Sequence, residues 1–400
     1  MQPEMNVVML GHVDHGKTSI TKALSGVWTD THSEELKRGI TIKMGYADVN
    51  IYKCSSCEGA EAYSTSEICP KCGFESKLLR KFSLLDAPGH ETLMTTAISA
   101  SSITDGAILV IAANEPCPQP QTAEHLNVLE ILDVDNIIVI QNKVDIIGMD
   151  RAKESYKQIK EFLKGTKAEN APIIPMVANQ GLNVDVLLKT IYEKIPVPER
   201  KKTNNLRMYI ARSFDVNKPG ADLTKLNGAV IGGSIIEGHI SEEQEIEISP
   251  GIIVDKKKGE FEPVITKVKG IRAGSEKLTE AGAGGLLALS TLLDPALAKS
   301  DGLVGQIVGT PGTLPSPVKK LKMKYKLISR ESDGNLTLIL NEPIVISVGT
   351  AITVGVITNM KKDLIEVTLK RPIVVEKKSK VAISKRAGNR WKLGGYGIIE

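Results

Sequence analysis

A short glycine-bounded loop near the N-terminus constrains the fold more than any other segment. Residues 11–18 read GHVDHGKT and fit the pattern G-x-x-x-x-G-K-[ST]. An apolar run over residues 7–10 precedes the loop, and a helical pattern covers residues 17–24. In such a strand–loop–helix unit the glycines let successive backbone N–H groups turn toward phosphate oxygens. The sequence therefore predicts an α/β domain with a phosphate-binding loop.

The side chains of this loop suggest how the phosphates and a cation would be held. Lys17 is expected to reach the β- and γ-phosphates, and the Thr18 hydroxyl to ligate Mg²⁺. The full set expected to bind nucleotide here is Asp14, His15, Gly16, Lys17, Thr18 and Ser19. The loop alone does not separate ATP from GTP.

A second motif makes that choice. Asn142, Lys143 and Asp145 follow the strand pattern NIIVIQ and so lie at the carboxyl edge of a parallel sheet, where ligands of α/β proteins bind. A carboxylate at Asp145 can accept from N1–H and the 2-amino group of guanine, and adenine offers neither donor there. Leaving a buried carboxylate unpaired is costly. Such a site can discriminate by ~10⁴. Asn142 can bond the base and the phosphate loop, Lys143 can lie against the base, and the Ala178 N–H can donate to guanine O6.

Two further segments suggest a response to the third phosphate. Asp86-Ala-Pro-Gly89-His90 ends a strand, so Asp86 would hold Mg²⁺ through water and the Gly89 N–H would meet the γ-phosphate. His90 is expected to orient the attacking water; taken alone, it reads better as a structural histidine at a helix start. Thr41, in RGITI (38–42), can ligate Mg²⁺ only when the γ-phosphate is present, as in an order–disorder switch.

Four of the five cysteines form two C-x-x-C pairs, each with a glycine just beyond it. Cys54, Cys57, Cys69 and Cys72 match a closed tetrahedral Zn²⁺ site, so the site is expected to be structural; the alternative is four free thiols. Cys117, among three prolines, is expected to be a packed thiol.

The chain divides by its patterns into three expected domains. Strand and helix signals alternate over residues 1–200, predicting a mostly parallel sheet with a zinc-knuckle insertion at 53–73. After a linker rich in proline, charge and asparagine, short strand patterns predict two all-β barrels, at 206–315 and 319–400. The last barrel is assigned the strands LKMKYKLI, NLTLIL, AITVGVIT, LIEVTLK, PIVVE and KVAISKR.

Charge is spread unevenly along the chain. Residues 319–400 hold 17 Lys/Arg and 7 Asp/Glu, whereas the whole chain carries a net charge of +4. This excess favours a polyanionic partner, although a solvated lysine-rich surface is the common alternative. Neither a membrane-length apolar run nor a secretory signal is seen, so a cytoplasmic protein without membrane contact is expected.

These motifs together resemble a translational GTPase, with two barrels in the arrangement of elongation factor Tu. Within that superfamily the chain is most similar to the γ-subunit family of archaeal and eukaryotic translation initiation factor 2. The segments that carry this resemblance are VWTDTHSEELKRGITIKMGYADV (27–49), the double C-x-x-C insertion, ANEPCPQPQTAEHL (113–126), YIARSFDVNKPG (209–220), GLVGQIVGTPGTLP (302–315) and RWKLGGYGIIE (390–400).

The resemblance implies the core of an αβγ heterotrimer that, with GTP bound, carries methionylated initiator tRNA to the small ribosomal subunit. It places the α subunit on the second domain, the β subunit on the GTP domain, and the tRNA acceptor end between these two domains. Tyr46 matches a position near the tRNA 3′ end, and Val13 and Ile40 match the apolar pair beside the water-orienting histidine. Lys17, Thr41 and His90 would then be the catalytic residues.

The sequence departs from the family pattern twice. Val177 replaces the usual serine of the last guanine motif, and Gly394-Gly395 is expected to loosen its strand. Two other interpretations stay open: an elongation or selenocysteine-specific factor, and a zinc-dependent scaffold whose nucleotide is purely structural.

Overall fold

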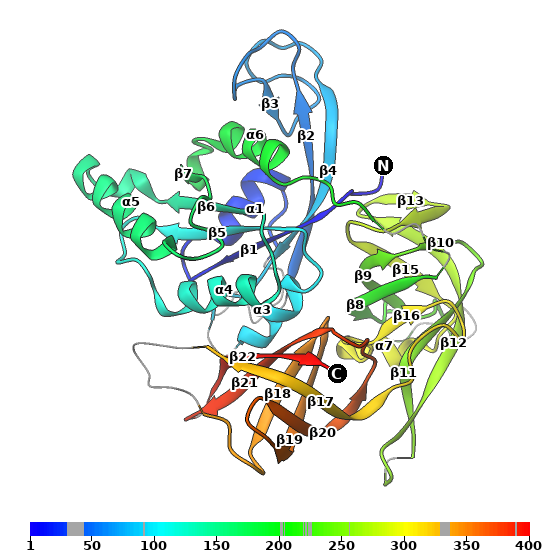
Figure 1. Ribbon diagram of the computed structural model, residues 1–400. Coiled ribbons are helices and arrows are strands. Elements are labelled where there is room, and N and C mark those ends of the chain that lie inside the picture. Colours follow the sequence, from blue (N-terminus) through cyan, green and yellow to red (C-terminus); the bar gives the residue numbers. More distant parts are fainter. Residues whose placement is uncertain are drawn as a thin grey trace. The chain divides into compact units, whose positions relative to one another are not determined.

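The computed structural model describes residues 1–29, 44–90, 93–200, 203, 205–218, 220, 222, 226–255, 257–328, 337–388 and 390–400. The chain forms two compact units (Figure 1). Pro3–Pro198 makes one, and Glu199–Glu400 with Met1–Gln2 makes the other. The predicted fold class is confirmed: an α/β domain with a mostly parallel sheet and a cysteine-rich insertion precedes two β-barrels.

The first unit is built on one mixed sheet with the strand order β3-β2-β4-β1-β5-β6-β7. Its parallel part runs from β4 to β7, and β2 and β3 are antiparallel additions at one edge. The strands are β1 (Asn6–Gly11), β2 (Gly45–Lys53), β3 (Tyr63–Ser64), β4 (Lys77–Asp86), β5 (Gly106–Ala112), β6 (Ile137–Asn142) and β7 (Ile173–Pro175).

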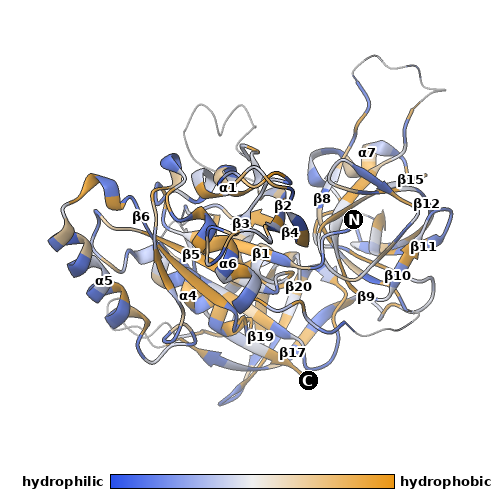
Figure 2. Ribbon diagram, turned by 90° about the horizontal axis from the view of Figure 1, so that it is seen from above, coloured by the Kyte–Doolittle hydropathy of each residue, from blue (hydrophilic) through white to orange (hydrophobic). Residues whose placement is uncertain are grey.

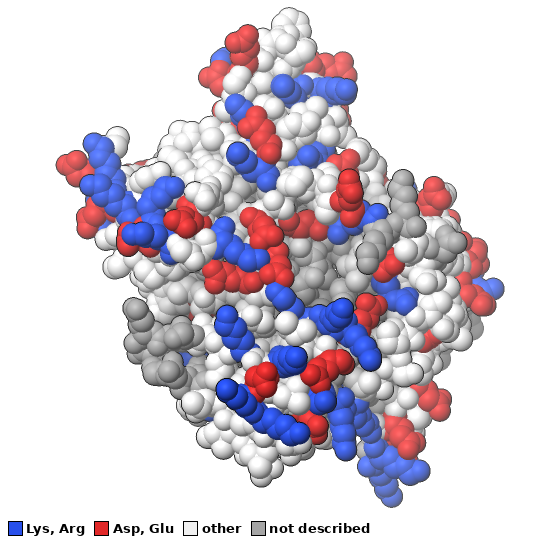
Figure 3. Space-filling model, in the orientation of Figure 1, with Lys and Arg blue, Asp and Glu red and all other residues white. Residues whose placement is uncertain are grey.

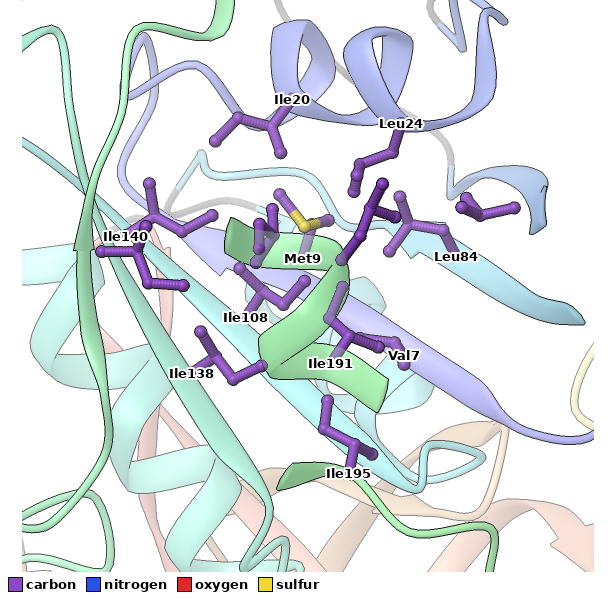
Figure 4. Close-up of a cluster of buried hydrophobic side chains, with 14 of the residues drawn as sticks. Val7, Met9, Ile20, Leu24, Leu84, Ile108, Ile138, Ile140, Ile191 and Ile195 are labelled. Carbon is purple, nitrogen blue, oxygen red and sulfur yellow. The ribbon is translucent and has the colours of Figure 1, made fainter. Parts of the chain in front are cut away.

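Helices cover both faces of this sheet, which explains why its central strands are apolar along their whole length. On one face α1 (Lys17–Ser25) and α6 (Val184–Lys194) pack against β1, β5 and β6, and Figure 4 shows Met9, Ile20, Ile108 and Ile191 meeting there. On the other face lie α3 (Met94–Ser101) and α4 (Pro120–Ile131). In Figure 2, β5 and β6 are mainly hydrophobic, whereas α5 (Met149–Leu163) is banded, as expected for a half-exposed helix.

The second unit begins with a barrel that the extra pairing of β11 with β12 closes. Around it the order is β11-β16-β8-β9-β15-β12, with β13 added beside β12 and a small β10–β14 pair. The strands are β8 (Arg207–Phe214), β9 (Val230–Glu237), β10 (His239–Ser241), β11 (Glu245–Asp255), β12 (Glu260–Ala273), β13 (Glu276–Leu278), β14 (Glu280–Gly282), β15 (Leu287–Thr291) and β16 (Ile307–Gly309). A four-residue helix, α7 (Pro295–Ala298), also lies here, although no helix was expected.

The last barrel is closed, with the order β17-β20-β19-β18-β21-β22. Its strands are β17 (Val318–Leu327), β18 (Pro343–Val348), β19 (Ala351–Met360), β20 (Leu364–Ile373), β21 (Lys380–Ala387) and β22 (Arg390–Ile399).

Two strand predictions in this barrel are wrong. NLTLIL is no strand over its described residues 337–340, where Ile339 and Leu340 are exposed, and the sequence PIVISV forms β18 instead. The residues assigned to a strand PIVVE begin within the end of β20. Apolar alternation in the sequence does not show which of two adjacent apolar segments pairs with a neighbouring strand on each side.

The expectation at Gly394-Gly395 is met at one residue only: the β21–β22 register shifts between Leu393 and Gly395, so Gly394 lies at an irregularity of the strand. Gly395 itself is paired with both β17 and β21, and a Cβ there would lie 2.3 Å from the carbonyl oxygen of Lys326. Glycine is therefore needed for close strand approach.

Lysine and arginine gather on one face of the second unit, over the last barrel and the β11–β12 hairpin (Figure 3). Strand β17 contributes an exposed lysine row: Lys319, Lys320, Lys322, Lys324 and Lys326. Its alternation with the buried Leu321 and Met323 follows from the two-residue period of a strand. The basic excess in the sequence is thus a surface property of the barrel.

Candidate guanine-nucleotide site and metal centre

Three loops of the first unit meet at the carboxyl edge of its parallel strands. The phosphate loop follows β1, the segment from Asp86 follows β4, and the segment from Asn142 closes β6. β1 lies between β4 and β5, so the chain crosses here from one side of the sheet to the other. Such a switch point is where open α/β sheets bind ligands.

The phosphate loop has the backbone that its glycines predict. Gly16 has a φ of 94°, and a Cβ there would lie 2.2 Å from Asn142 Nδ2. Lys17 is 6% exposed, and its Nζ donates to the carbonyl oxygens of Gly11 (3.1 Å) and His12 (2.7 Å). The ammonium group therefore lies inside the curve of the loop, where its positive charge would attract a phosphate.

Asn142 joins this loop to the predicted base site. Its Nδ2 donates to the His15 carbonyl oxygen at 2.9 Å, and its Oδ1 accepts from the Ala178 N–H at 3.2 Å. Asn142 is buried, so both bonds lie away from water. The predicted contact with the phosphate loop is present. The Ala178 N–H, expected to serve guanine O6, is directed at Asn142 and would have to be shared with a base.

A pocket of about 240 Å³ opens beside Asn142. Its lining brings together three of the sequence segments assigned to nucleotide: Gly16, Ser19, Asn142, Lys143, Asp145, Ile146, Val177, Ala178 and Asn179. Lys143 adopts a left-handed backbone with a φ of 62°, and Asp145 follows in a short 3-10 turn. Asp145 is exposed, so its carboxylate stays solvated until a ligand covers it.

Asp86 is fully buried, and its Oδ2 accepts two hydroxyl hydrogen bonds. One comes from Thr18 Oγ1 and the other from Thr29 Oγ1, each at 2.7 Å. Oxygen donors gathered on a buried carboxylate fit the preference of Mg²⁺ for hard ligands. Gly89 lies against the Lys17 ammonium, since a Cβ there would be 2.5 Å from Lys17 Nζ. His90 is half-buried at the end of the same segment.

Two buried histidines help to hold the phosphate loop in place. Nδ1 of the fully buried His125, on α4, accepts from the Gly11 N–H at 3.0 Å, and burial lowers its pKa to about 3. The ring is therefore neutral with its proton on Nε2. His15 lies between the Val110 carbonyl (3.0 Å) and Glu115 (3.3 Å), and burial lowers its pKa as well. His15 thus points into the protein, so only its backbone can serve a phosphate.

The four paired cysteines converge in the insertion between β2 and β4. Their sulfurs all lie within 4.8 Å of one another, with Cys54 Sγ and Cys72 Sγ at 3.4 Å and Cys57 Sγ and Cys69 Sγ at 3.8 Å. Gly59 and Gly73 have left-handed φ values of 67° and 76°, which turn the two knuckles. Four sulfurs in a closed cluster are the donor set of a structural zinc site.

The remaining predicted residues divide into three groups. Tyr46, on β2, is 47% exposed and available to a partner. Val13 is half-buried in the phosphate loop. Thr41, Ile40 and the rest of RGITI lie outside the described residues.

Sequence reasoning missed Thr29 and His125. Both lie in segments that carry the family resemblance, 27–49 and 113–126, but neither belongs to a short motif that would indicate its role. Each reaches the site only through tertiary structure, 57 residues from Asp86 and 114 from Gly11.

Family comparison agrees with this geometry. Residues 2–197 match the elongation factor Tu GTP-binding domain, and residues 319–399 match the C-terminal domain of initiation factor eIF2 gamma. Translation initiation factor 2 subunit gamma of Methanothermobacter thermautotrophicus is 53% identical over 100% of this chain and 99% of its own. The protein of the same name from Archaeoglobus fulgidus is 52% identical, over 99% and 94%.

Solved structures extend the likeness of the fold to other factors. The bacterial selenocysteine-specific elongation factor EF-Sec matches with a TM-score of 0.76 at 25% identity, covering all of this chain and 58% of that one. SelB from Methanococcus maripaludis, in complex with the GTP analogue GppNHp, gives 0.74 at 23%, covering all of this chain and 79% of that one. Among the helices of the described residues, none has the length and apolar character of a membrane span. The chain belongs to the gamma-subunit family of translation initiation factor 2, and it is a GTPase of the translational type.

Proposed function

We propose that this initiation factor subunit is the nucleotide-controlled core of an αβγ heterotrimer that carries methionylated initiator tRNA to the small ribosomal subunit in the cytoplasm. The observation that carries the proposal is the joining of base pocket and phosphate loop through Asn142. A site that reads guanine and phosphate together suits a carrier whose affinity for its cargo depends on the nucleotide.

The residues around the phosphates divide the work of hydrolysis. Lys17 neutralises charge on the β- and γ-phosphates, and the Gly89 N–H senses the third phosphate. His90 orients the attacking water. Thr18, Asp86 and Thr41 would hold Mg²⁺, which when bound offsets the charge that develops on the phosphate oxygens. Because no arginine finger is evident in the motifs, the intrinsic rate is expected to be slow without an activating partner.

Guanine selection falls to the second motif. Asp145 accepts from the two guanine donors, Lys143 supports the base face with its stem, and Asn142 ties the base position to the phosphate loop. The exposed Asp145 becomes desolvated as the base covers it. An adenine would then leave the carboxylate without partners, which disfavours adenine nucleotides.

The cysteine cluster would bind Zn²⁺ as a structural element. The Cys72 thiol, by hydrogen bonding, raises the pKa of Cys57 to about 12, whereas the backbone N–H of Cys72 lowers that of Cys69 to about 7. Cys69 is thus more readily available than Cys57 as thiolate, the form that binds metal.

The partners follow from surface chemistry and family membership. The lysine row on β17 offers spaced positive charges to the phosphodiester backbone of an RNA. Tyr46 is an exposed aromatic that can stack near the tRNA 3′ end. The α subunit is expected on the second domain and the β subunit on the GTP domain.

Initiator-tRNA binding by the chain with its α subunit tests the proposal directly. Affinity for methionylated initiator tRNA should be higher with GppNHp than with GDP, and elongator aminoacyl-tRNA should bind weakly in both states. Equal initiator affinity with the two nucleotides would contradict the switch, and preference for elongator tRNA would contradict the role in initiation.

A further inference from the structure

Thr29 is bound to the carboxylate that would serve the magnesium site. Its Oγ1 donates to Asp86 Oδ2 at 2.7 Å, the same distance at which Thr18 Oγ1 donates to that oxygen. Thr18 lies within the phosphate-loop motif, whereas Thr29 lies beyond the end of α1, at Ser25. Nothing in the motif chemistry requires a second hydroxyl on Asp86.

The two hydroxyls take up the hydrogen-bonding capacity of this oxygen. A carboxylate oxygen has two lone pairs, and Oδ2 uses one for each threonine. The Thr18 bond is compatible with metal ligation, because a hydroxyl can offer a lone pair to a cation while its hydrogen points at Asp86. The Thr29 bond takes the second lone pair of Oδ2, so a metal-bound water that approaches this oxygen would have to displace the threonine hydroxyl.

Packing holds Thr29 in this place. A Cβ on Gly45 would lie 2.6 Å from the Thr29 Cβ, so the threonine fits against a glycine with no room to spare. Gly45 is the residue opposite Asp86 in the register of β2 with β4. Thr29 therefore rests on the strand pair that carries the carboxylate. Beside it, Trp28 is 44% exposed, and the centre of its ring lies 5.5 Å from Lys22 Nζ. The fluorescence of this indole can therefore be used to follow changes in the short segment.

We propose that Thr29 is a positioning residue that competes with the hydration shell of magnesium for Asp86 Oδ2, and so sets the Mg²⁺ concentration at which the protein retains GDP. The inference rests on the magnesium site of the proposed function. Removing the Thr29 hydroxyl leaves Oδ2 with a lone pair for metal-bound water, so magnesium should act at lower concentration.

Release of N-methylanthraniloyl-GDP from the full chain, measured against MgCl₂ concentration, tests this competition. Thr29→Val keeps the shape of the side chain and removes the donor, so the half-effective MgCl₂ concentration should fall by about threefold or more. Thr29→Ser restores the hydroxyl and should behave as the unmodified protein does. Ser25→Ala removes a nearby hydroxyl that bonds only backbone groups, namely the Thr21 and Val27 carbonyl oxygens and the Val27 N–H, and it should leave the half-effective MgCl₂ concentration unchanged.

Trp28 supplies a second readout that does not depend on nucleotide release. The only other tryptophan is Trp391, so Trp391→Phe leaves Trp28 as the sole indole emitter. With GDP bound, MgCl₂ should shift Trp28 emission with the same half-effective concentration as release, and Thr29→Val should reduce that shift.

The outcomes separate this inference from the site beneath it. If GDP release from the unmodified protein does not respond to MgCl₂, the magnesium site is wrong and the role of Thr29 falls with it. If release responds but Thr29→Val gives an unchanged or higher half-effective concentration, the site stands and the competition is refuted. A Thr29→Ser variant that behaves like Thr29→Val would also refute it.

Discussion

The side-chain amide of Asn142 donates to the backbone carbonyl of His15 at 2.9 Å, so the segment that reads the base is tied to the loop that holds the phosphates. Oδ1 of the same side chain accepts a hydrogen bond from the Ala178 N–H. Asn142 therefore also contacts the third segment assigned to the nucleotide. One buried amide thus fixes three loops that lie far apart in the sequence.

Removing this amide should weaken nucleotide binding more than it weakens the fold. Asn142→Ala leaves a buried N–H and a buried carbonyl without partners, each worth about 1–3 kcal/mol. GDP affinity, measured by fluorescence titration, is expected to fall by about 10- to 100-fold. Asn179→Ala changes an exposed residue of the same pocket and should have little effect. Comparable losses in both variants would argue against a special role for Asn142.

The cysteine cluster predicts bound metal with a defined stoichiometry. Purified protein should contain about one zinc per chain by atomic emission, because the four clustered sulfurs match one tetrahedral ion. Cys69→Ser should lose most of this zinc, whereas Cys117→Ser should retain it, since burial raises the pKa of the Cys117 thiol to about 12 and it lies outside the cluster. An unchanged zinc content in Cys69→Ser would exclude the assigned site.

His125 predicts a specific acid sensitivity. Burial lowers its pKa to about 3 in the folded protein, below the ordinary value of 6.5, so the unfolded chain binds a proton that the folded chain refuses. Its contribution to stability is complete above pH 6.5 and is lost as pH falls toward 3. At pH 5 the loss is about 2 kcal/mol.

His125→Gln keeps an acceptor for the Gly11 N–H but does not titrate. Urea unfolding of the first unit, followed at pH 7.5 and pH 5, should therefore show a smaller pH dependence in the variant than in the unmodified protein. Equal pH dependence in both would mean that His125 is not the responsible group.

Paired glycines in β22 offer a matched test of the barrel. A Cβ on Gly395 would lie 2.3 Å from Lys326 O, so Gly395→Ala should force the strands apart and destabilise the barrel by about 1–3 kcal/mol. The nearest atom to a Cβ on Gly394 is 3.6 Å away, so Gly394→Ala should be tolerated. Thermal unfolding distinguishes them; a larger loss in Gly394→Ala would contradict the strand register.

The predicted nucleotide residues came from local patterns because their chemistry needs adjacent residues. A phosphate loop requires glycines and a lysine at fixed spacing, and a zinc knuckle requires two cysteines within one turn. Such constraints are visible in a single sequence. The strong apolar runs of β5 and β6 were equally readable, since strands covered on both faces have no polar side.

The features that were not predicted depend on contacts between residues that lie far apart in the sequence. Thr29 and His125 matter because folding brings them to Asp86 and Gly11, and neither has a neighbour in sequence that reveals this. Asp145 is exposed, and its carboxylate would become buried only when a base covers it. In the last barrel, local alternation favoured NLTLIL, but partner strands on both sides selected Pro343–Val348.

Guanine selectivity at Asp145 can be measured by nucleotide competition. GDP, ADP and XDP are each used to displace N-methylanthraniloyl-GDP from the unmodified protein and from Asp145→Asn. Only GDP is expected to compete strongly in the unmodified protein. In the variant, preference should shift toward XDP, because the asparagine amide donates to the extra oxygen of xanthine. Equal competition by ADP and GDP in the unmodified protein would contradict the account.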